Sequence, residues 1–180
     1  MHQVAYVLAE QFYNSFCQSL TDTSKVVDFG SYNENGCLRP IFQRHAYIGI
    51  DMSAGPNVDI VCSNETTPFE SNSIDIVVSS SCFEHDACFW MTFLEMCRIL
   101  KEGGYIYINA PSAGFYHGYP GDCWRFYKDS WAALQTWATR HGYSVELVYT
   151  HLSDKDPTWK DNVGVFRKKS LESKDNLPSV

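Results

Sequence analysis

Short apolar runs alternate with amphipathic segments along this chain, which is the order that a sheet covered by helices requires. Leu8, Phe12 and Phe16 recur every four residues and predict a helix over residues 3–19, so residues 1–24 are expected to form an N-terminal covering segment. Apolar runs rich in β-branched residues predict buried strands. They cover residues 26–29, 47–51, 58–62, 74–79, 105–109, 144–149 and 162–167. The pattern predicts an α/β fold.

The connections between these strands differ in length. A short helix is expected over residues 37–44, with Pro40 in its first turn. Only six residues, 52–57, separate the second strand from the third, whereas a parallel crossover normally needs about a dozen. The helix after the second strand is therefore expected to be shortened or missing, with a turn at Gly55-Pro56.

Two longer helices are expected in the second half of the chain. The first covers residues 88–100, with Asp86 as its cap and Gly103-Gly104 as its end. The second starts at Asp129 or Ser130 and stops at Gly142. The apolar positions expected to face inward are Phe89, Phe93, Cys97 and Leu100 in the first helix and Trp131, Leu134 and Ala138 in the second.

Composition restricts the class of protein. A chain of 180 residues is expected to form one domain, over residues 1–168, with a charged and disordered tail at 169–180. The net charge of −7 argues against a nucleic-acid partner. Seven cysteines without a CxxC pair predict free thiols in a reducing compartment. No secretory signal or membrane-length apolar run is visible, so a cytoplasmic protein without a membrane partner is expected.

A nucleotide-binding pattern lies near the N-terminal end. The segment 25–36 is an apolar run that ends at Asp28 and enters a turn with Gly30. A second apolar run ends at Asp51, which can accept hydrogen bonds from a ribose diol. The three-glycine dinucleotide fingerprint is absent, since only Gly30 and Gly36 remain, and the side chains of Tyr32 and Glu34 would crowd a pyrophosphate. The turn therefore suits a ribose-containing ligand without a diphosphate better than NAD.

Four segments together resemble the class I S-adenosylmethionine-dependent methyltransferases, of the methyltransferase-domain type found in small-molecule and glycan pathways. They are VVDFGSYNENG, YIGID, TPFESNSIDIVVSSSCFEH and FLEMCRILKEGGYIYINAP, within residues 25–130. The resemblance implies a Rossmann-like, seven-stranded, mostly parallel sheet with helices on both faces and one antiparallel strand near the C-terminus. It also implies S-adenosylmethionine as the methyl donor and S-adenosylhomocysteine as the product.

The resemblance places the donor at the ends of the first four strands. The family's acid at the first strand, which contacts the methionine part of the donor, corresponds to Asp28, and the ribose-binding acid corresponds to Asp51. Ser63 and Asn64 stand where the family often has an acid, so adenine would be read by Asn64 or by backbone amides. The expected donor-binding residues are Asp28, Gly30, Ser31, Asp51, Met52, Ser63, Asn64 and Ser80.

The acceptor is expected to meet the long aromatic loop over residues 110–127. His117 is the candidate catalytic base, and His85, after the fourth strand, is the reserve candidate. Asp122 can orient His117, bind an acceptor hydroxyl or pair with Arg125. The expected substrate-binding residues are His85, Tyr119, Asp122, Trp124 and Arg125. A structural ion pair and a core tryptophan are the alternative interpretation of this loop.

These residues together predict a methyltransferase that acts on a small polar acceptor. The segment Ser79–Cys82 lacks the Asn/Asp-Pro-Pro-aromatic motif that base-modifying amino-methyltransferases of the family carry. This favours transfer to a hydroxyl or a carboxylate over an exocyclic amine of a nucleobase, on an acceptor such as a saccharide. The alternative is a non-catalytic donor-binding protein or a supporting subunit of a partner methyltransferase. No metal is expected, because the sequence has no HExxH and no clustered carboxylates. A homo-oligomer is compatible with the sequence.

Overall fold

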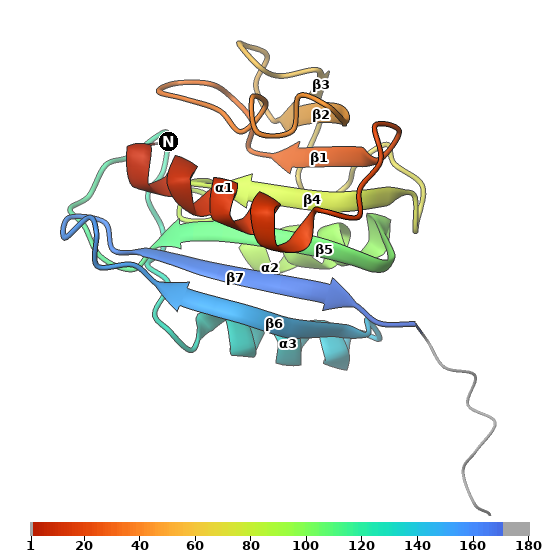
Figure 1. Ribbon diagram of the computed structural model, residues 1–180. Coiled ribbons are helices and arrows are strands. Elements are labelled where there is room, and N and C mark those ends of the chain that lie inside the picture. The colour runs from red at the N-terminus through yellow and green to blue at the C-terminus, as the bar shows by residue number, and fades with distance from the viewer. Residues whose placement is uncertain (1, 171–180) are drawn as a thin grey trace, which may run out of the picture.

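A seven-stranded sheet runs through the computed structural model, which describes residues 2–170 (Figure 1). The strand order is β3-β2-β1-β4-β5-β7-β6. Neighbouring strands pair in parallel except at β7, which is antiparallel to both β5 and β6. The strands are β1 (Lys25–Phe29), β2 (Ala46–Asp51), β3 (Ile60–Val61), β4 (Ile74–Ser80), β5 (Leu100–Pro111), β6 (Val145–Leu152) and β7 (Asp161–Lys168). The predicted sheet, including its antiparallel strand, is confirmed.

Helices cover both faces of this sheet, as predicted. α1 (Gln3–Phe16) lies on one face, and α2 (Phe89–Ile99) and α3 (Ser130–Arg140) lie on the other (Figure 1). No helix within residues 2–170 is long and apolar enough to cross a membrane. All seven cysteines are free thiols. Most of the tail expected to be disordered, residues 171–180, lies outside the described part of the chain.

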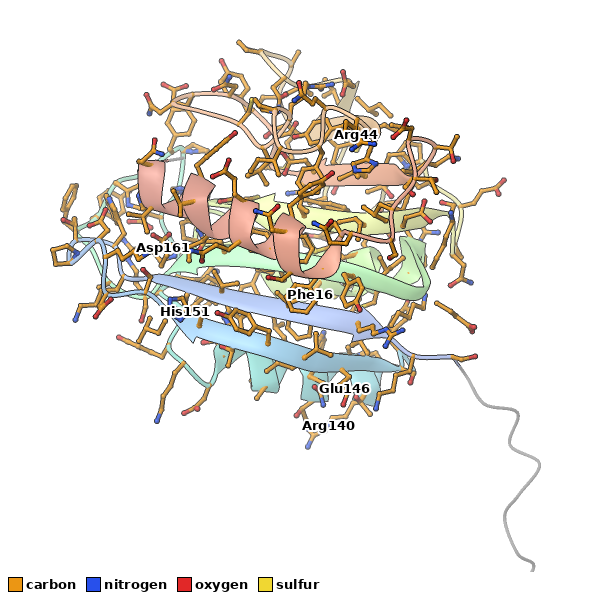
Figure 2. All side chains as sticks on the ribbon, viewed as in Figure 1. Phe16, Arg44, Arg140, Glu146, His151 and Asp161 are labelled. Carbon is orange, nitrogen blue, oxygen red and sulfur yellow. The ribbon has the colours of Figure 1, made fainter. Side chains whose placement is uncertain are left out.

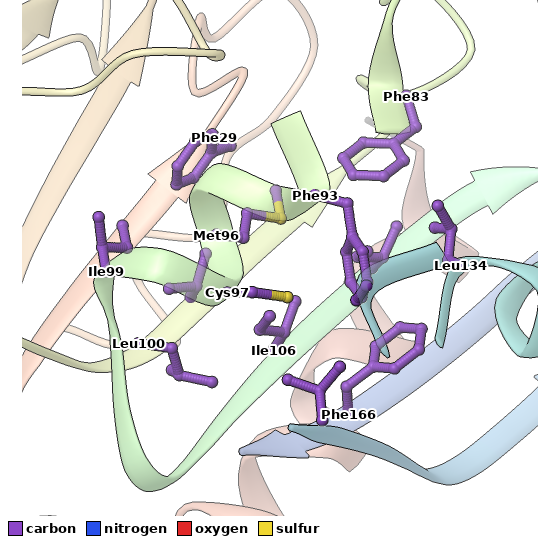
Figure 3. Packing of buried hydrophobic residues seen from close by; sticks show 14 of the residues in the cluster. Phe29, Phe83, Phe93, Met96, Cys97, Ile99, Leu100, Ile106, Leu134 and Phe166 are labelled. Carbon is purple, nitrogen blue, oxygen red and sulfur yellow. The ribbon is translucent and has the colours of Figure 1, made fainter. Parts of the chain in front are cut away.

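Two apolar cores result from the alternation of side chains along the strands. Successive residues of a strand point to opposite faces, so Val27 and Phe29 pack toward α2 and α3 while Val26 packs toward α1. In the larger core Phe93 of α2 lies 4.7 Å from Phe166 of β7, measured between ring centroids (Figure 3). The inward-facing positions predicted for α2 and α3 are buried, apart from Phe89, which is partly exposed.

α1 is attached to the sheet at both of its ends. At its N-terminal end, Nε2 of His2 lies 3.2 Å from Oδ2 of the buried Asp161, at the start of β7 (Figure 2). At its other end the ring of Phe16 packs 5.4 Å from Tyr105 and 6.2 Å from Tyr149. The helix is shorter than predicted, because Cys17 has a non-helical backbone conformation and the amide of Leu20 turns back to the carbonyl of Cys17.

Two predicted features of the first half have different outcomes. The short helix predicted over residues 37–44 is wrong, because these residues form successive turns. The amide of Ile41 bonds to the carbonyl of Leu38, and Pro40 has no N–H with which to extend a helical ladder. The absence of a helix after β2 is confirmed, since residues 52–59 contain none.

The junction between α2 and β5 also differs from the prediction. α2 ends at Ile99 and β5 begins at the next residue, so Gly103-Gly104 lies within the strand and does not end the helix. Lys168 of β7 satisfies the end of the helix, because its Nζ donates to the carbonyls of Cys97 and Leu100 at 2.7 Å. A Cβ at Gly104 would lie 2.6 Å from the carbonyl oxygen of Asp75, so glycine permits the close approach of β4.

Gly164 of β7 is expected to be intolerant of any side chain. A Cβ there would lie 2.7 Å from Cγ of the buried Trp131. Gly164→Ala should therefore lower the free energy of unfolding by about 1–3 kcal/mol, measured by urea denaturation. Gly121→Ala is the matched control, because its Cβ would meet only Sγ of Cys123 at 3.6 Å, and it should change stability by less than about 0.5 kcal/mol. Equal stability of the two variants would contradict this account of β7.

The contact between His2 and Asp161 predicts a pH-dependent stability. The hydrogen bond with Asp161 raises the pKa of His2 above its ordinary value. The contact therefore stabilises the fold fully below the unfolded-state pKa of about 6.5 and is lost as pH rises through the higher folded-state pKa. In urea denaturation across a pH series, His2→Gln should flatten the decline in stability between about pH 6 and pH 8. His141→Gln, at the exposed end of α3, should leave this decline in stability unchanged.

Candidate active site

The turn after β1 packs against the segment that follows β4. The amides of Gly30 and Ser31 both donate to the carbonyl of Ile50 at 3.0 Å, which holds the turn at the carboxyl edge of the sheet. Gly30 has a φ of 73°, and a Cβ there would lie 2.3 Å from Sγ of Cys82. Glycine is therefore required both by the backbone conformation and by the approach of Cys82. The hydroxyl of Ser31 is turned away, toward the carbonyl of Asn57.

The two acids predicted on the donor side occupy different environments. Asp51, at the end of β2, is partly exposed, and its carboxylate accepts the amides of Tyr32 at 3.2 Å and Ser53 at 2.9 Å. Asp28 is buried below the turn and accepts a short hydrogen bond from the hydroxyl of Tyr47. Burial raises the pKa of Asp28 to about 7. Asp51 therefore faces the edge where a ligand would lie, while Asp28 supports that edge from within.

Polar atoms without protein partners lie in the segment after β3 and at the end of β4. Asn64, after β3, is 7% exposed, and its Oδ1 is buried without a hydrogen bond. Oγ of Ser80, at the end of β4, is also buried without a hydrogen bond. An unsatisfied buried polar atom costs about 1–3 kcal/mol, so each of these two atoms could form a hydrogen bond with a ligand. Ser63 is used locally, because its hydroxyl accepts the amide of Glu65, and Met52 is exposed beside Asp51.

The long loop between β5 and α3 is attached to the segment after β4. The carbonyl of Glu84 accepts the amides of Cys123 at 2.7 Å and Trp124 at 3.2 Å. Nδ1 of His85 bonds to the carbonyl of Gly121 at 2.5 Å. Further along, the ring of Phe126 stacks on Trp131 of α3 with centroids 5.2 Å apart. The loop therefore has a defined position over the ends of β4 and β5.

Asp122 is the centre of this loop. Its side chain is 2% exposed and accepts Nη1 of Arg125 at 2.5 Å, Nη2 of Arg125 at 2.8 Å and the amide of His117 at 2.8 Å. Nδ1 of His117 lies 3.2 Å from the same carboxylate. Hydrogen bonds from Arg125 hold the pKa of Asp122 well below its usual range. Of the three roles considered for Asp122, the pairing with Arg125 and the orientation of His117 are both present.

The two candidate bases lie side by side, although they are 32 residues apart in the sequence. The rings of His85 and His117 are 4.9 Å apart between centroids and meet edge to face. Burial lowers the pKa of His85. Glu84, which sequence analysis did not select, lies beside them, with its Oε1 3.7 Å from Nε2 of His85. Burial raises the pKa of Glu84 to about 8. An acid directly after a buried strand was the signal that could have identified it.

The aromatic residues predicted to bind an acceptor point in different directions. Tyr119 is exposed and donates to Glu34 of the turn after β1 at 2.9 Å, so the loop reaches across to the donor side. Trp124 instead packs on Phe89 and Trp90 of α2, and its Nε1 donates to the carbonyl of Asp86. There it lines an apolar cavity of about 340 Å³ between α2 and α3, together with Arg125 and other residues.

The similarities of this chain to known proteins are consistent with a methyltransferase fold. Residues 36–108 match a family model described as a methyltransferase domain. No curated protein matches the chain. Among solved structures, 1,6-didemethyltoxoflavin-N1-methyltransferase from Burkholderia thailandensis, with its substrate and S-adenosylhomocysteine bound, is similar at a TM-score of 0.72. It is 15% identical over 92% of this chain and 79% of its own.

Two further solved structures are similar over most of both chains. A chain of the complex between the Haloferax volcanii Trm112 methyltransferase activator and its methyltransferase partner has a TM-score of 0.61 at 16% identity, over 92% of this chain and 96% of its own. An S-adenosyl-L-methionine-dependent methyltransferase from Methanococcus maripaludis has a TM-score of 0.61 at 19% identity, over 94% of this chain and 87% of its own. At these identities the likeness concerns the fold. The domain match over residues 36–108 and the sheet topology together support the resemblance to the class I S-adenosylmethionine-dependent methyltransferases, whose fold this chain has.

Proposed function

We propose that the chain transfers a methyl group from S-adenosylmethionine to a hydroxyl of a small polar acceptor, such as a saccharide or a related metabolite. The observation that carries this proposal is the dyad of His117 and the buried Asp122 beside the ends of β4 and β5. A carboxylate on Nδ1 holds the imidazole in one tautomer and leaves Nε2 to accept a proton. The sequence Ser79–Cys82 at the end of β4, without the motif of amino-methyltransferases, favours oxygen as the acceptor atom.

The residues on the donor side fit the methyl donor. Asp51 would accept hydrogen bonds from the ribose hydroxyls, and the free Oδ1 of Asn64 would accept one from the adenine amino group. The hydroxyl of Ser80 and the backbone at Gly30 would line the methionine portion, with Asp28 supporting the turn. When bound, S-adenosylmethionine supplies a methyl group that its sulfonium charge already activates. The protein therefore has mainly to align the acceptor oxygen, which is a matter of proximity and orientation.

On the acceptor side, His117 would remove the hydroxyl proton, with His85 as the reserve base. Tyr119 would contact an acceptor that lies between the loop and the turn after β1, because its hydroxyl already bonds to Glu34. Arg125 would act mainly through Asp122, and Trp124 would contact a larger acceptor only from the side of α2.

A second candidate is a donor-binding subunit that supports a partner. It is favoured by one observation, the similarity to a chain from a complex with a methyltransferase activator. Assays for S-adenosylhomocysteine formation with a panel of sugars, phenols and small acids would separate the two candidates. Turnover by the chain alone would support the enzyme, and tight donor binding without turnover across the panel would support the subunit.

Donor binding should depend on Asp51. Titration calorimetry should show binding of S-adenosylhomocysteine, and Asp51→Ala should weaken it by about 1–3 kcal/mol through the loss of ribose hydrogen bonds. Asp22→Ala is the control, because Asp22 is 75% exposed and makes only a surface ion pair with Arg44 at 3.2 Å. It should leave the affinity nearly unchanged if the fold is kept. Equal affinities of wild type and Asp51→Ala would remove this residue from the site.

Catalysis should depend on His117. His117→Ala should lower kcat by about 10²–10⁴-fold because the base is lost, while donor affinity stays nearly intact. His85→Ala is the matched comparison, because its ring lies beside that of His117. An unchanged kcat in His117→Ala with a large loss in His85→Ala would assign the base to His85. Full activity in both variants would mean that the acceptor needs no base.

A further inference from the structure

Three metal-ligating side chains meet at the mouth of the candidate active site. Glu84, His85 and His117 each offer one ligand atom, and these atoms all lie within 4.8 Å of one another. Two of the ligands follow β4, and the third comes from the loop between β5 and α3. A set of two imidazoles and one carboxylate is typical of Zn²⁺ and related divalent transition metals.

The hydrogen bonds of the two histidines leave the same nitrogen free on each ring. A carbonyl can only accept, so Nδ1 of His85 carries the proton that bonds to Gly121 at 2.5 Å. Nδ1 of His117 bonds to the carbonyl of Phe115 at 3.3 Å and lies 3.2 Å from the carboxylate of Asp122, and these two acceptors favour its proton there over the longer contact with Nη2 of Arg125 at 3.4 Å. In a neutral imidazole, Nε2 is then unprotonated and can bind a metal. Metal-ligating histidines commonly donate their other N–H to a backbone carbonyl or a carboxylate, which is the arrangement of both rings here.

The carboxyl group of Glu84 is an independent sign of a missing cation. Its side chain is 2% exposed, and Oε2 has no hydrogen-bond partner. A buried carboxylate normally has a cation or several donors, because its desolvation is expensive. Arg125 does not fill this role, because its guanidinium bonds to Asp122. Oε2 of Glu84 therefore has no hydrogen-bond donor and no cation beside it among residues 2–170.

We propose that Glu84, His85 and His117 bind one divalent transition-metal ion of the Zn²⁺ type. Metal–ligand distances of about 2.0–2.2 Å require the three ligand atoms to approach one another by about 1 Å, within the reach of side-chain rotation. Three protein ligands leave a coordination position open for water or a small ligand. Sequence analysis expected no metal because these ligands form no local motif and meet only through the fold.

The metal site is a function additional to the proposed methyl transfer, and metal binding would inhibit that reaction. The metal would occupy Nε2 of His117, which is the atom that the proposed base uses. Metal binding and proton acceptance by His117 therefore exclude each other, and the metal-loaded chain should lose the part of its turnover that depends on His117. Metal binding itself needs neither donor nor acceptor, so it can be measured whether or not methyl transfer is found.

The test is a titration of the chelator-treated full chain with Zn²⁺ by calorimetry, and with Co²⁺ by its visible absorption, in the absence of any other ligand. One ion per chain is expected. Glu84→Gln and His117→Ala should each weaken binding by at least about 100-fold, and Asp122→Asn by about 10–100-fold because it only orients His117. The matched controls are His151→Ala on β6 (Figure 2) and Cys123→Ser, an exposed thiol, and both should bind as the wild type does.

Two results would overturn the proposal. One is the absence of a stoichiometric ion at high micromolar Zn²⁺ or Co²⁺, and the other is equal affinity in wild type, Glu84→Gln and His117→Ala. Glu84→Gln keeps the size of the side chain, and its thermal unfolding without metal checks that the fold is kept. Failure of methyl transfer would show instead as absent turnover in the metal-free chain, whose capacity to bind the metal is measured separately.

Discussion

The buried ion pair between Asp122 and Arg125 holds the acceptor side of the site together. A loop of this length without helix or strand has a large conformational entropy to overcome. Asp122 compensates for it locally, since its carboxylate accepts both terminal nitrogens of Arg125 and the amide of His117. Asp122 is shielded from solvent and depends on these donors, so removing either partner of the ion pair would release the loop and the imidazole with it.

The parallel sheet determines where this loop can lie. β4 and β5 are parallel neighbours, so their carboxyl ends open on the same edge, and the segments that follow them meet there. The carbonyl of Glu84 accepts two amides of the loop, and side-chain bonds from His85 to Gly121 and from Trp124 to Asp86 add to this connection. The imidazoles of His85 and His117 come together as a consequence of these contacts.

The donor side is built with few helices, and polar contacts take their place. Where a crossover helix would normally follow β2, Arg39 donates to Asn57 at 2.7 Å and to Asp59 at 2.6 Å. Asp59 in turn accepts the amide of Gly49 within β2. This network fixes the short loop beside Asp51 without the burial that a helix would provide. The short loop therefore leaves the carboxyl edge of the sheet uncovered by a helix at the position proposed for the ribose.

Sequence alone determined the strands, the three main helices and the methyltransferase fold, because alternation and periodicity depend on neighbouring residues. It also placed His85, His117 and Asp122 in one region, from their positions after β4 and β5. The predicted helix over residues 37–44 was wrong, because Pro40 and tertiary contacts prevail over local helix propensity. The predicted end of α2 at Gly103-Gly104 was also wrong, because the helix ends at Ile99 and Lys168 donates to its last carbonyls. The tertiary structure alone decided that Glu84 is buried beside two imidazoles and that Asp122 holds both Arg125 and His117. Those contacts join residues that are far apart in the sequence, so no local sequence pattern predicts how close they lie in the fold.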